Sequence, residues 1–209
     1  MTKKIILISF LAFLIQVQSN AQTKKWHTQT TKDKITVKSC ISDTLIDGET
    51  RQLVEYISKI EVVADYEACV AVLKNIPLHK QIFEYTEKSV KIKEINANEW
   101  IIYYFLDVPW PMPNSDSVIK MKFSTDKASN TTYFYMTTSP KSVEDKGYRR
   151  VKVSNSSYTL KKLANNKVSI VSTTYSVPTI KAPDWLANSW IPEGPAEILR
   201  KIIKLSKTK

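Results

Sequence analysis

The chain has 209 residues and a formal net charge of +11, from 31 lysines and arginines against 20 acidic residues. This length suits one domain with a substantial core, and no linker or repeat divides it. Its only glycines, Gly48, Gly147 and Gly194, are far apart, which excludes the glycine-rich loops that bind dinucleotides or nucleoside triphosphates. The basic residues are spread along the chain, so they indicate a lysine-rich soluble surface and not nucleic-acid binding.

The first residues have the pattern of a cleaved secretory signal. Lys3 and Lys4 precede an apolar run over 5–15 that is too short to span a bilayer. Ser19 and Ala21 then place small residues at the two positions that a signal peptidase reads. An uncleaved interfacial anchor is less favoured because the run lacks a charged face. The predicted organisation is a signal peptide over 1–21, a flexible N-terminal segment over 22–31 and a single domain over 32–207.

Export to the periplasm or secretion follows from this signal. Such a compartment would permit a disulfide between Cys40 and Cys69. We favour two buried thiols slightly, because one cysteine lies in a predicted strand and the other in a predicted helix. Neither has a cysteine or histidine at the spacing of a metal site, so no metal is predicted.

The middle of the chain is predicted to be mostly strand. Asp47-Gly48 predicts a hairpin turn between the first two strands. A helix is predicted over 64–74, where apolar residues recur at three and four and Asp65 can cap the first turn. The segment 100–106 is apolar on both faces, so we expect it to be covered on two sides. The predicted strands are 34–42, 51–63, 89–95, 100–106, 118–123, 131–137, 149–153, 156–162 and 166–177.

A long amphipathic helix is predicted over 185–207, at the end of the chain. Pro192 and the Gly194-Pro195 pair should divide it into two pieces or kink it. The expected fold class is α+β, with a curved antiparallel sheet wrapped around this helix and a smaller helix inserted early. The side expected to be buried contains Ala187, Ile191, Pro195, Ile198, Leu199, Ile202, Ile203 and Leu205, and the opposite side contains Glu193, Glu197, Arg200, Lys201 and Lys204.

Three short motifs resemble those of START domains, the steroidogenic-acute-regulatory-related lipid transfer family. Trp110-Pro-Met-Pro113 followed by Ser115-Asp-Ser-Val118 resembles the family's P-x-P and R-D-x-V entry to a central strand. Gly147-Tyr-Arg-Arg-Val151 resembles its G-Y-V-R strand, and Pro183-Asp-Trp-Leu-Ala-Asn188 resembles its P-x-W-L-V-N start of the closing helix. The resemblance covers Lys32 to Ser206. It departs at Ser115, where the family often has arginine, so a salt bridge from that position cannot be assumed.

The resemblance implies a helix-grip fold with a hydrophobic tunnel for a lipid, a sterol or another apolar molecule. The wider Bet v 1-like superfamily also contains polyketide cyclases and aromatic-ring hydroxylase domains, so the fold alone does not decide the function. On this basis we expect an exported protein that binds an apolar small molecule, and transfer of that molecule between membranes is a further possibility. The alternatives are a polyketide or aromatic cyclase and a partner-binding domain with a filled core.

Alternating positions in neighbouring strands supply candidate ligand-binding residues. An ordinary filled core explains any one of them equally well, and only the resemblance favours a cavity. The resemblance also suggests that Arg150 meets a polar head group in the tunnel, although alternation alone directs it outward. Trp190 is expected near the tunnel rim. The strand candidates are Tyr104, Leu106, Met121, Phe123, Tyr133 and Tyr135.

Enzyme signals are weak, and no catalytic residue or cofactor is predicted. His27 lies near the start of the mature protein, and His79 lies in a turn-like segment where a solvated loop histidine is favoured. If the protein were a cyclase, the tunnel tyrosines or an acid would donate protons. The expected partner is the apolar ligand, with no nucleic acid. Transient membrane contact through the basic face of the last helix and the oligomeric state are left open.

Overall fold

The computed structural model describes residues 24–110, 112–181 and 183–207, except for the side chains of residues 184 and 186. The signal peptide predicted over 1–21 lies outside these residues. None of the helices within the described ranges is both long and apolar enough to cross a membrane.

The described residues form one ten-stranded sheet. Its strands are β1 (His27–Thr30), β2 (Thr36–Ile46), β3 (Glu49–Val63), β4 (Thr86–Asn96), β5 (Glu99–Leu106), β6 (Ser115–Asp126), β7 (Thr131–Thr138), β8 (Arg149–Arg150), β9 (Val153–Lys162) and β10 (Lys167–Val177). The spatial order is β1-β2-β3-β10-β9-β7-β6-β5-β4, and every pair along this path is antiparallel. The short β8 pairs in parallel with β6. The predicted helix-grip sheet is confirmed.

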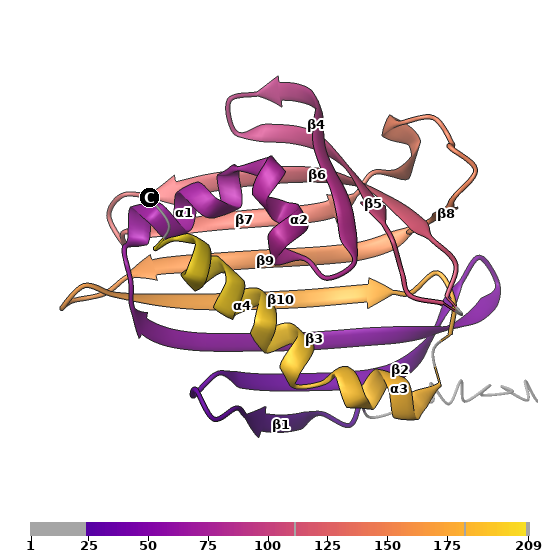
Figure 1. The fold of residues 1–209 in the computed structure, drawn as a ribbon, viewed down its shortest axis with the longest axis horizontal. Coiled ribbons are helices and arrows are strands. Elements are labelled where there is room, and N and C mark those ends of the chain that lie inside the picture. Colours follow the sequence, from indigo (N-terminus) through magenta and orange to yellow (C-terminus); the bar gives the residue numbers. More distant parts are fainter. Residues whose placement is uncertain (1–23, 111, 182, 208–209) are drawn as a thin grey trace, which may run out of the picture.

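All the labelled helices lie on one face of this sheet, which we call the inner face (Figure 1). They are α1 (Tyr66–Lys74), α2 (His79–Ile82), α3 (Asp184–Trp190) and α4 (Glu193–Leu205), with short 3₁₀ turns at Ile76–Leu78 and Pro140–Ser142. The Asp65 side chain accepts a hydrogen bond from the Ala68 backbone N–H and so caps α1, as predicted. The closing helix is divided at Ile191-Pro192, also as predicted, while Gly194 and Pro195 lie within the first turn of α4.

The apolar side of α4 packs against the middle of the inner face. Leu199 and Ile202 are fully buried, and Ile198 and Ile203 are nearly so. They belong to one continuous core with residues from α1 and from β2, β3, β5, β6, β7, β9 and β10. The amphipathic pattern of the closing helix is therefore confirmed for α4.

The opposite face of the sheet, which we call the outer face, has a smaller apolar cluster. Ile101 and Tyr103 of β5 pack there with Val118 of β6, and Phe105 and Val143 contact the cluster. The segment between β7 and β8 covers them, since Val143 and Tyr148 both belong to it and the Tyr148 ring lies 4.8 Å from the Phe105 ring. This arrangement confirms that β5 is covered on both sides.

Two sequence-based expectations need correction. His27–Thr30 form β1 and pair with β2, so the segment predicted to be flexible over 22–31 is partly ordered. The strand predicted over 149–153 is interrupted, because β8 ends at Arg150 and β9 begins at Val153. Arg200 lies on the polar side of α4, as predicted, and it also joins α4 to the β1–β2 turn.

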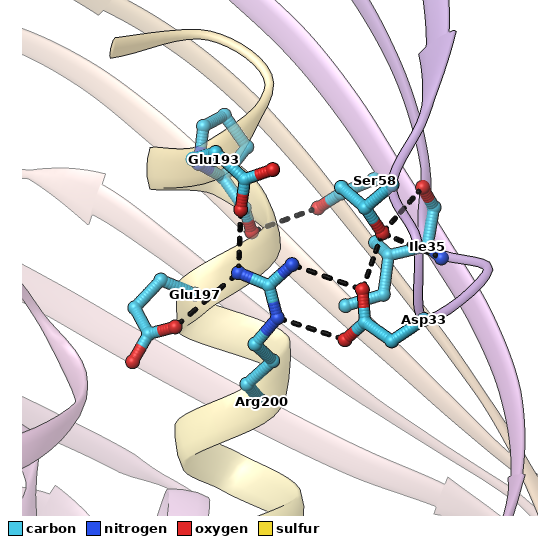
Figure 2. Close-up of polar contacts among 8 residues, drawn as sticks. Asp33, Ile35, Ser58, Glu193, Glu197 and Arg200 are labelled. Atoms are coloured by element: carbon cyan, nitrogen blue, oxygen red, sulfur yellow. Dashed lines mark hydrogen bonds and ion pairs between the residues drawn. The ribbon is translucent and has the colours of Figure 1, made fainter.

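Figure 2 shows this junction. The Arg200 guanidinium donates to both carboxylate oxygens of Asp33, at 2.8 and 2.9 Å. It also contacts Glu193 at 2.8 Å and Glu197 at 3.4 Å. The hydrogen bonds from Arg200, and then from Thr31, hold the pKa of the Asp33 carboxyl well below its usual range. A planar guanidinium bound at two points fixes direction as well as distance, so this junction orients α4 across the sheet.

Asp33→Asn should destabilise the protein at neutral pH by about 0.5–1 kcal/mol, since the pair is partly exposed and screened by solvent. The folded-state pKa of Asp33 is depressed, so the stabilisation is complete above about pH 5 and decreases as pH falls below the ordinary value of about 3.9. Urea unfolding from pH 7 down to pH 2 measures the difference between wild type and variant. A difference that does not narrow in acid would contradict the assignment. Asp43→Asn is the control, because Asp43 contacts Lys181 at 3.4 Å through a single exposed pair.

Candidate ligand site on the inner face

The inner face changes character along β10. Alternate residues of a strand share one face, and on β10 the inward positions begin with Val168 and Ile170, which are fully buried in the core. The next three inward positions are Ser172, Thr174 and Ser176. The same strand face is therefore apolar at its start and bears hydroxyl groups toward its end.

Along the neighbouring strand β9 the inward residues change in the opposite order, from hydroxyl-bearing at its start to apolar toward its end. Its inward positions are Ser154, Ser156, Tyr158 and then Leu160. Because β9 and β10 are antiparallel, the hydroxyl-bearing halves lie side by side. Ser156 is directly opposite Thr174, with their hydroxyl oxygens 3.1 Å apart, and Ser154 is opposite Ser176. We call Ser154, Ser156, Thr174 and Ser176 the hydroxyl patch.

The helical cover also differs between the two halves. Figure 1 shows α1, α2 and α4 over the half of β9 and β10 that carries the apolar residues, while the ends near Val153 and Val177 lie clear of them. Leu160 and Ile170 are fully buried, whereas Ser154, Ser156 and Ser176 are partly exposed. Thr174 is itself buried, so the part of the hydroxyl patch that the core leaves partly open is formed by the three serines.

Trp190, at the joint between α3 and α4, lies beside the patch. Its ring contacts the Tyr56 ring edge to face at 5.8 Å, and Tyr56 is directly opposite Thr174. The indole N–H donates to Glu84 at 2.6 Å, which fixes the ring. A Cβ on Gly194 would lie 1.8 Å from the indole, so only glycine leaves room for it. The partly buried Trp190 therefore closes the patch on the α4 side.

Comparisons with known proteins support the fold. No family model matches the sequence, and no curated protein is significantly similar to it. Among solved structures, the STAR-related lipid transfer protein fragment from Xanthomonas axonopodis superposes with a TM-score of 0.71 at 20% identity, covering 88% of this chain and 99% of that one. Human StAR-related lipid transfer protein 5 gives 0.69 at 15% identity, covering 90% and 88%. The chain has the helix-grip fold of START domains.

An aromatase/cyclase structure is also similar, over a smaller part of the chain. The Zhui aromatase/cyclase from Streptomyces sp. R1128 superposes with a TM-score of 0.50 at 12% identity, covering 74% of this chain and 94% of that one. The START-type structures cover more of the chain and superpose better. They identify the architecture, while the chemistry of the site depends on the residues of this chain.

Four of the expected ligand-binding residues lie on the inner face of the START-type sheet. Tyr104, Met121 and Phe123 are almost completely buried in the main core, and Leu106 is partly buried against it. The Phe123 ring packs 5.1 Å from Trp100 and 5.7 Å from Phe134. The inward direction of the four is confirmed, while their contact with a ligand stays a prediction.

The expected inward direction of Tyr133 and Tyr135 is wrong. Both lie on the outer face, where their rings stack at 6.5 Å and Tyr135 is 49% exposed. Phe134 and Met136 occupy the inward positions of β7. The cause is that this strand has large apolar residues on both faces, so alternation fits either register and a slip of one residue inverts it.

Arg150 does not point toward the inner face. Its guanidinium binds Asp116 at two points, at 2.7 and 2.9 Å, on the outer side of the sheet. It also donates to the backbone carbonyls of Pro140, Val143 and Glu144. Asp116 is fully buried, and the ion pair with Arg150 neutralises its charge. The START motif has an arginine directly before this aspartate, and this chain has Ser115 at that position. Arg150 therefore positions the loop over β5 and is unavailable to a ligand on the inner face.

His79 is fully buried, which corrects the expectation of a solvated loop histidine. The 3₁₀ turn at Ile76–Leu78 folds it back against α1, where Nε2 lies 2.9 Å from the Leu73 carbonyl. A carbonyl only accepts, so Nε2 carries the proton, and Nδ1 accepts from the Tyr104 hydroxyl at 2.7 Å. Burial lowers the pKa of His79 to about 4. Because both side chains are sealed in the core, the pair is a structural contact and not an exposed acid–base site.

The remaining reactive groups are structural too. Cys40 and Cys69 are both buried free thiols, and burial raises the pKa of each. Within the described residues, no group of three histidine, cysteine or acidic side chains is placed to hold a metal ion. The hydroxyl patch was missed by sequence reasoning. The signal was present in the alternate serines and threonine of the last two strands, which meet only when the strands are paired.

Stability should fall with acid because of His79. The unfolded-state pKa is about 6.5 and the folded-state value is about 4, so the unfolded chain takes up the proton first as pH is lowered. The stabilisation is complete above about pH 7, and about 2–3 kcal/mol of it should be lost by pH 4.5. Urea unfolding at both pH values measures this loss, which should be smaller in His79→Gln. The exposed His27 is the control, and His27→Gln should leave the loss unchanged. An equal loss in His79→Gln would contradict the assignment.

Proposed function

We propose that the protein binds a lipid or another apolar small molecule that has an uncharged polar group. The ligand lies between the hydroxyl patch and α3, with its polar group on the patch. The observation that carries this proposal is the partial exposure of Ser154, Ser156 and Ser176 on an inner face whose other half is sealed.

The chemistry of the patch supports this class of ligand. Serine and threonine hydroxyls donate and accept hydrogen bonds without charge, so they suit hydroxyl, ester or amide groups. A partly exposed apolar residue adjoins them on the inner face, since Val54 is directly opposite Ser176. Each methylene that a ligand buries contributes about 0.8 kcal/mol, so an acyl chain or a ring system needs no ionic contact to be retained.

Transfer requires contact with a membrane, and two exposed tryptophans favour one end of the molecule for it. Trp110 in the β5–β6 loop is 92% exposed, and Trp185 in α3 is 72% exposed. A hydrogen bond of 3.2 Å between Ser115 and Thr179 joins the base of this loop to the segment before α3. Tryptophan is favoured at the membrane–water interface because its ring is amphipathic. We place the transient membrane contact here and not on the basic face of α4, where Arg200 already binds acidic side chains.

The cyclase alternative is less well supported. Tyr133 and Tyr135, the expected proton donors, lie on the outer face, and Tyr104 is sealed in the core against His79. The other alternative, a partner-binding domain with a filled interior, would retain no small molecule. The mass-spectrometry experiment described next therefore distinguishes it from a lipid-binding protein.

Native mass spectrometry of protein purified from its own host is expected to show a retained apolar molecule. A fluorescent fatty-acid methyl ester, whose polar group is uncharged, then serves as the titration probe. Ser156→Val with Thr174→Val should weaken binding about tenfold, because a buried polar group of the ligand loses its hydrogen bonds. Ser157→Val with Thr173→Val is the matched control, since these residues are paired on the outer face of the same strands. Unchanged binding in the first variant would contradict the patch, and an empty wild type that binds no probe would contradict the function.

We also propose that the protein is exported after cleavage behind Ala21. Expression of the full chain in a Gram-negative host should give a product whose intact mass begins at Gln22 and which fractionates outside the cytoplasm. Ala21→Arg should block cleavage, because the peptidase requires a small residue at this position. A cytoplasmic product that retains Met1 would contradict export without affecting the proposed ligand.

A further inference from the structure

A pocket of about 400 Å³ lies at the end of the sheet near the β2–β3 turn. Val153 and Val177 contribute to its wall and are paired with each other across β9 and β10. They alternate with Ser154 and Ser176 along the strands, so they face outward. This pocket, which we call the basic pocket, is therefore on the other side of the sheet from the hydroxyl patch.

Cationic residues from different strands line the basic pocket. Arg51 comes from β3, Arg149 from β8, and Lys152 from the segment that leads into β9. No ion pair joins Arg149 to an acidic side chain in the part of the chain that the structure describes. The other two have partners, with Arg51 2.7 Å from Glu49 and Lys152 3.2 Å from Asp47.

These two ion pairs can be displaced by a ligand. The side chains of Glu49 and Asp47 are 67% and 73% exposed, so both carboxylates are free to turn into water. Exposed pairs of this kind contribute little to stability. A more highly charged anion would therefore compete successfully with them for Arg51 and Lys152.

The base of the pocket is rigid. Arg150 also lines it, but its guanidinium is fixed by Asp116 and three backbone carbonyls. The Val151 backbone N–H donates to the Asp116 carbonyl at 2.8 Å, which holds the next residue as well. Arg149 and Lys152 thus project from a backbone that is fixed before any ligand arrives, and this lowers the entropic cost of binding.

From this geometry we infer that the basic pocket binds a phosphate monoester. Three cations converge on one space, a guanidinium can bind phosphate oxygens in pairs, and the doubly charged group outcompetes a single carboxylate. Val153, Val177 and Pro178 offer apolar contact to the molecule that bears the phosphate. The volume suits a small phosphorylated metabolite or the head group of an anionic lipid. The inference is independent of the proposed binding of an apolar ligand on the inner face.

Two probes distinguish the sources of the phosphate. Glycerol 3-phosphate is titrated by isothermal calorimetry, and phosphatidylcholine vesicles with and without phosphatidic acid are tested by flotation. Arg149→Gln with Lys152→Gln should weaken binding about tenfold or more, because both charged hydrogen-bond donors are lost. The control matched in charge is Lys127→Gln with Lys161→Gln, at the opposite end of the sheet. Circular dichroism and the urea midpoint verify that each variant is folded.

The outcomes distinguish a soluble phosphate ligand, a lipid head group and the absence of a phosphate site. Selective loss of glycerol 3-phosphate binding in the pocket variant supports a soluble ligand. Selective loss of phosphatidic-acid flotation, without binding of the soluble probe, supports a lipid head group. An equal loss of binding in the pocket variant and in the charge-matched control would show that general surface charge causes the effect, and this would overturn the inference. Wild-type protein that binds neither probe would also overturn it. Binding of the fluorescent methyl ester by the pocket variant should remain at the wild-type level, so a failure of the phosphate inference leaves the proposed function intact.

Discussion

The packing of α4 against the inner face is the contact on which the rest of the structure depends. Its apolar side is buried against strands that come from both halves of the chain, and Leu199 and Ile202 are fully buried there. An isolated helix of 13 residues is marginal in water, so α4 depends on the sheet as much as the sheet's exposed apolar face depends on α4. The two-point contact between Arg200 and Asp33 then sets the angle at which the helix crosses the strands.

The position of α4 also decides where a ligand can bind. Figure 1 shows α1, α2 and α4 over one half of β9 and β10. Under these helices the inner face is mostly apolar, with buried hydroxyls at Ser58 and Ser172, and beyond them Ser154, Ser156 and Ser176 are partly exposed. A buried polar group without a partner is costly, so a row of hydroxyl side chains is favoured where water or a ligand can reach it. The division between core and candidate site thus follows from the length of the helical cover, with Trp190 and Gly194 at its border.

The sequence was sufficient to predict the START-type fold, the early helix, the β2–β3 turn and the divided closing helix, because each depends on local patterns. Asp47 and Gly48 both have positive φ, as a two-residue hairpin turn of this type requires. The site was harder to predict, since it depends on register. Tyr133 and Tyr135 were assigned to the wrong face because β7 is apolar on both. For Arg150, alternation indicated the correct outward direction and only the family resemblance suggested a tunnel contact, while its partner Asp116, 34 residues away, could not be identified from the sequence. His79 was expected in solvent because only tertiary packing brings Tyr104 to it.

The centre of the sheet joins distant parts of the chain. The ten residue pairs between β3 and β10 link segments that are more than a hundred positions apart. Closing so long a loop delays the pairing, and topologies rich in distant contacts fold slowly. A nascent chain on the ribosome therefore cannot complete its central ladder until nearly all of it has emerged. This order of assembly leaves β3 without its partner strand until the last part of the chain has been made.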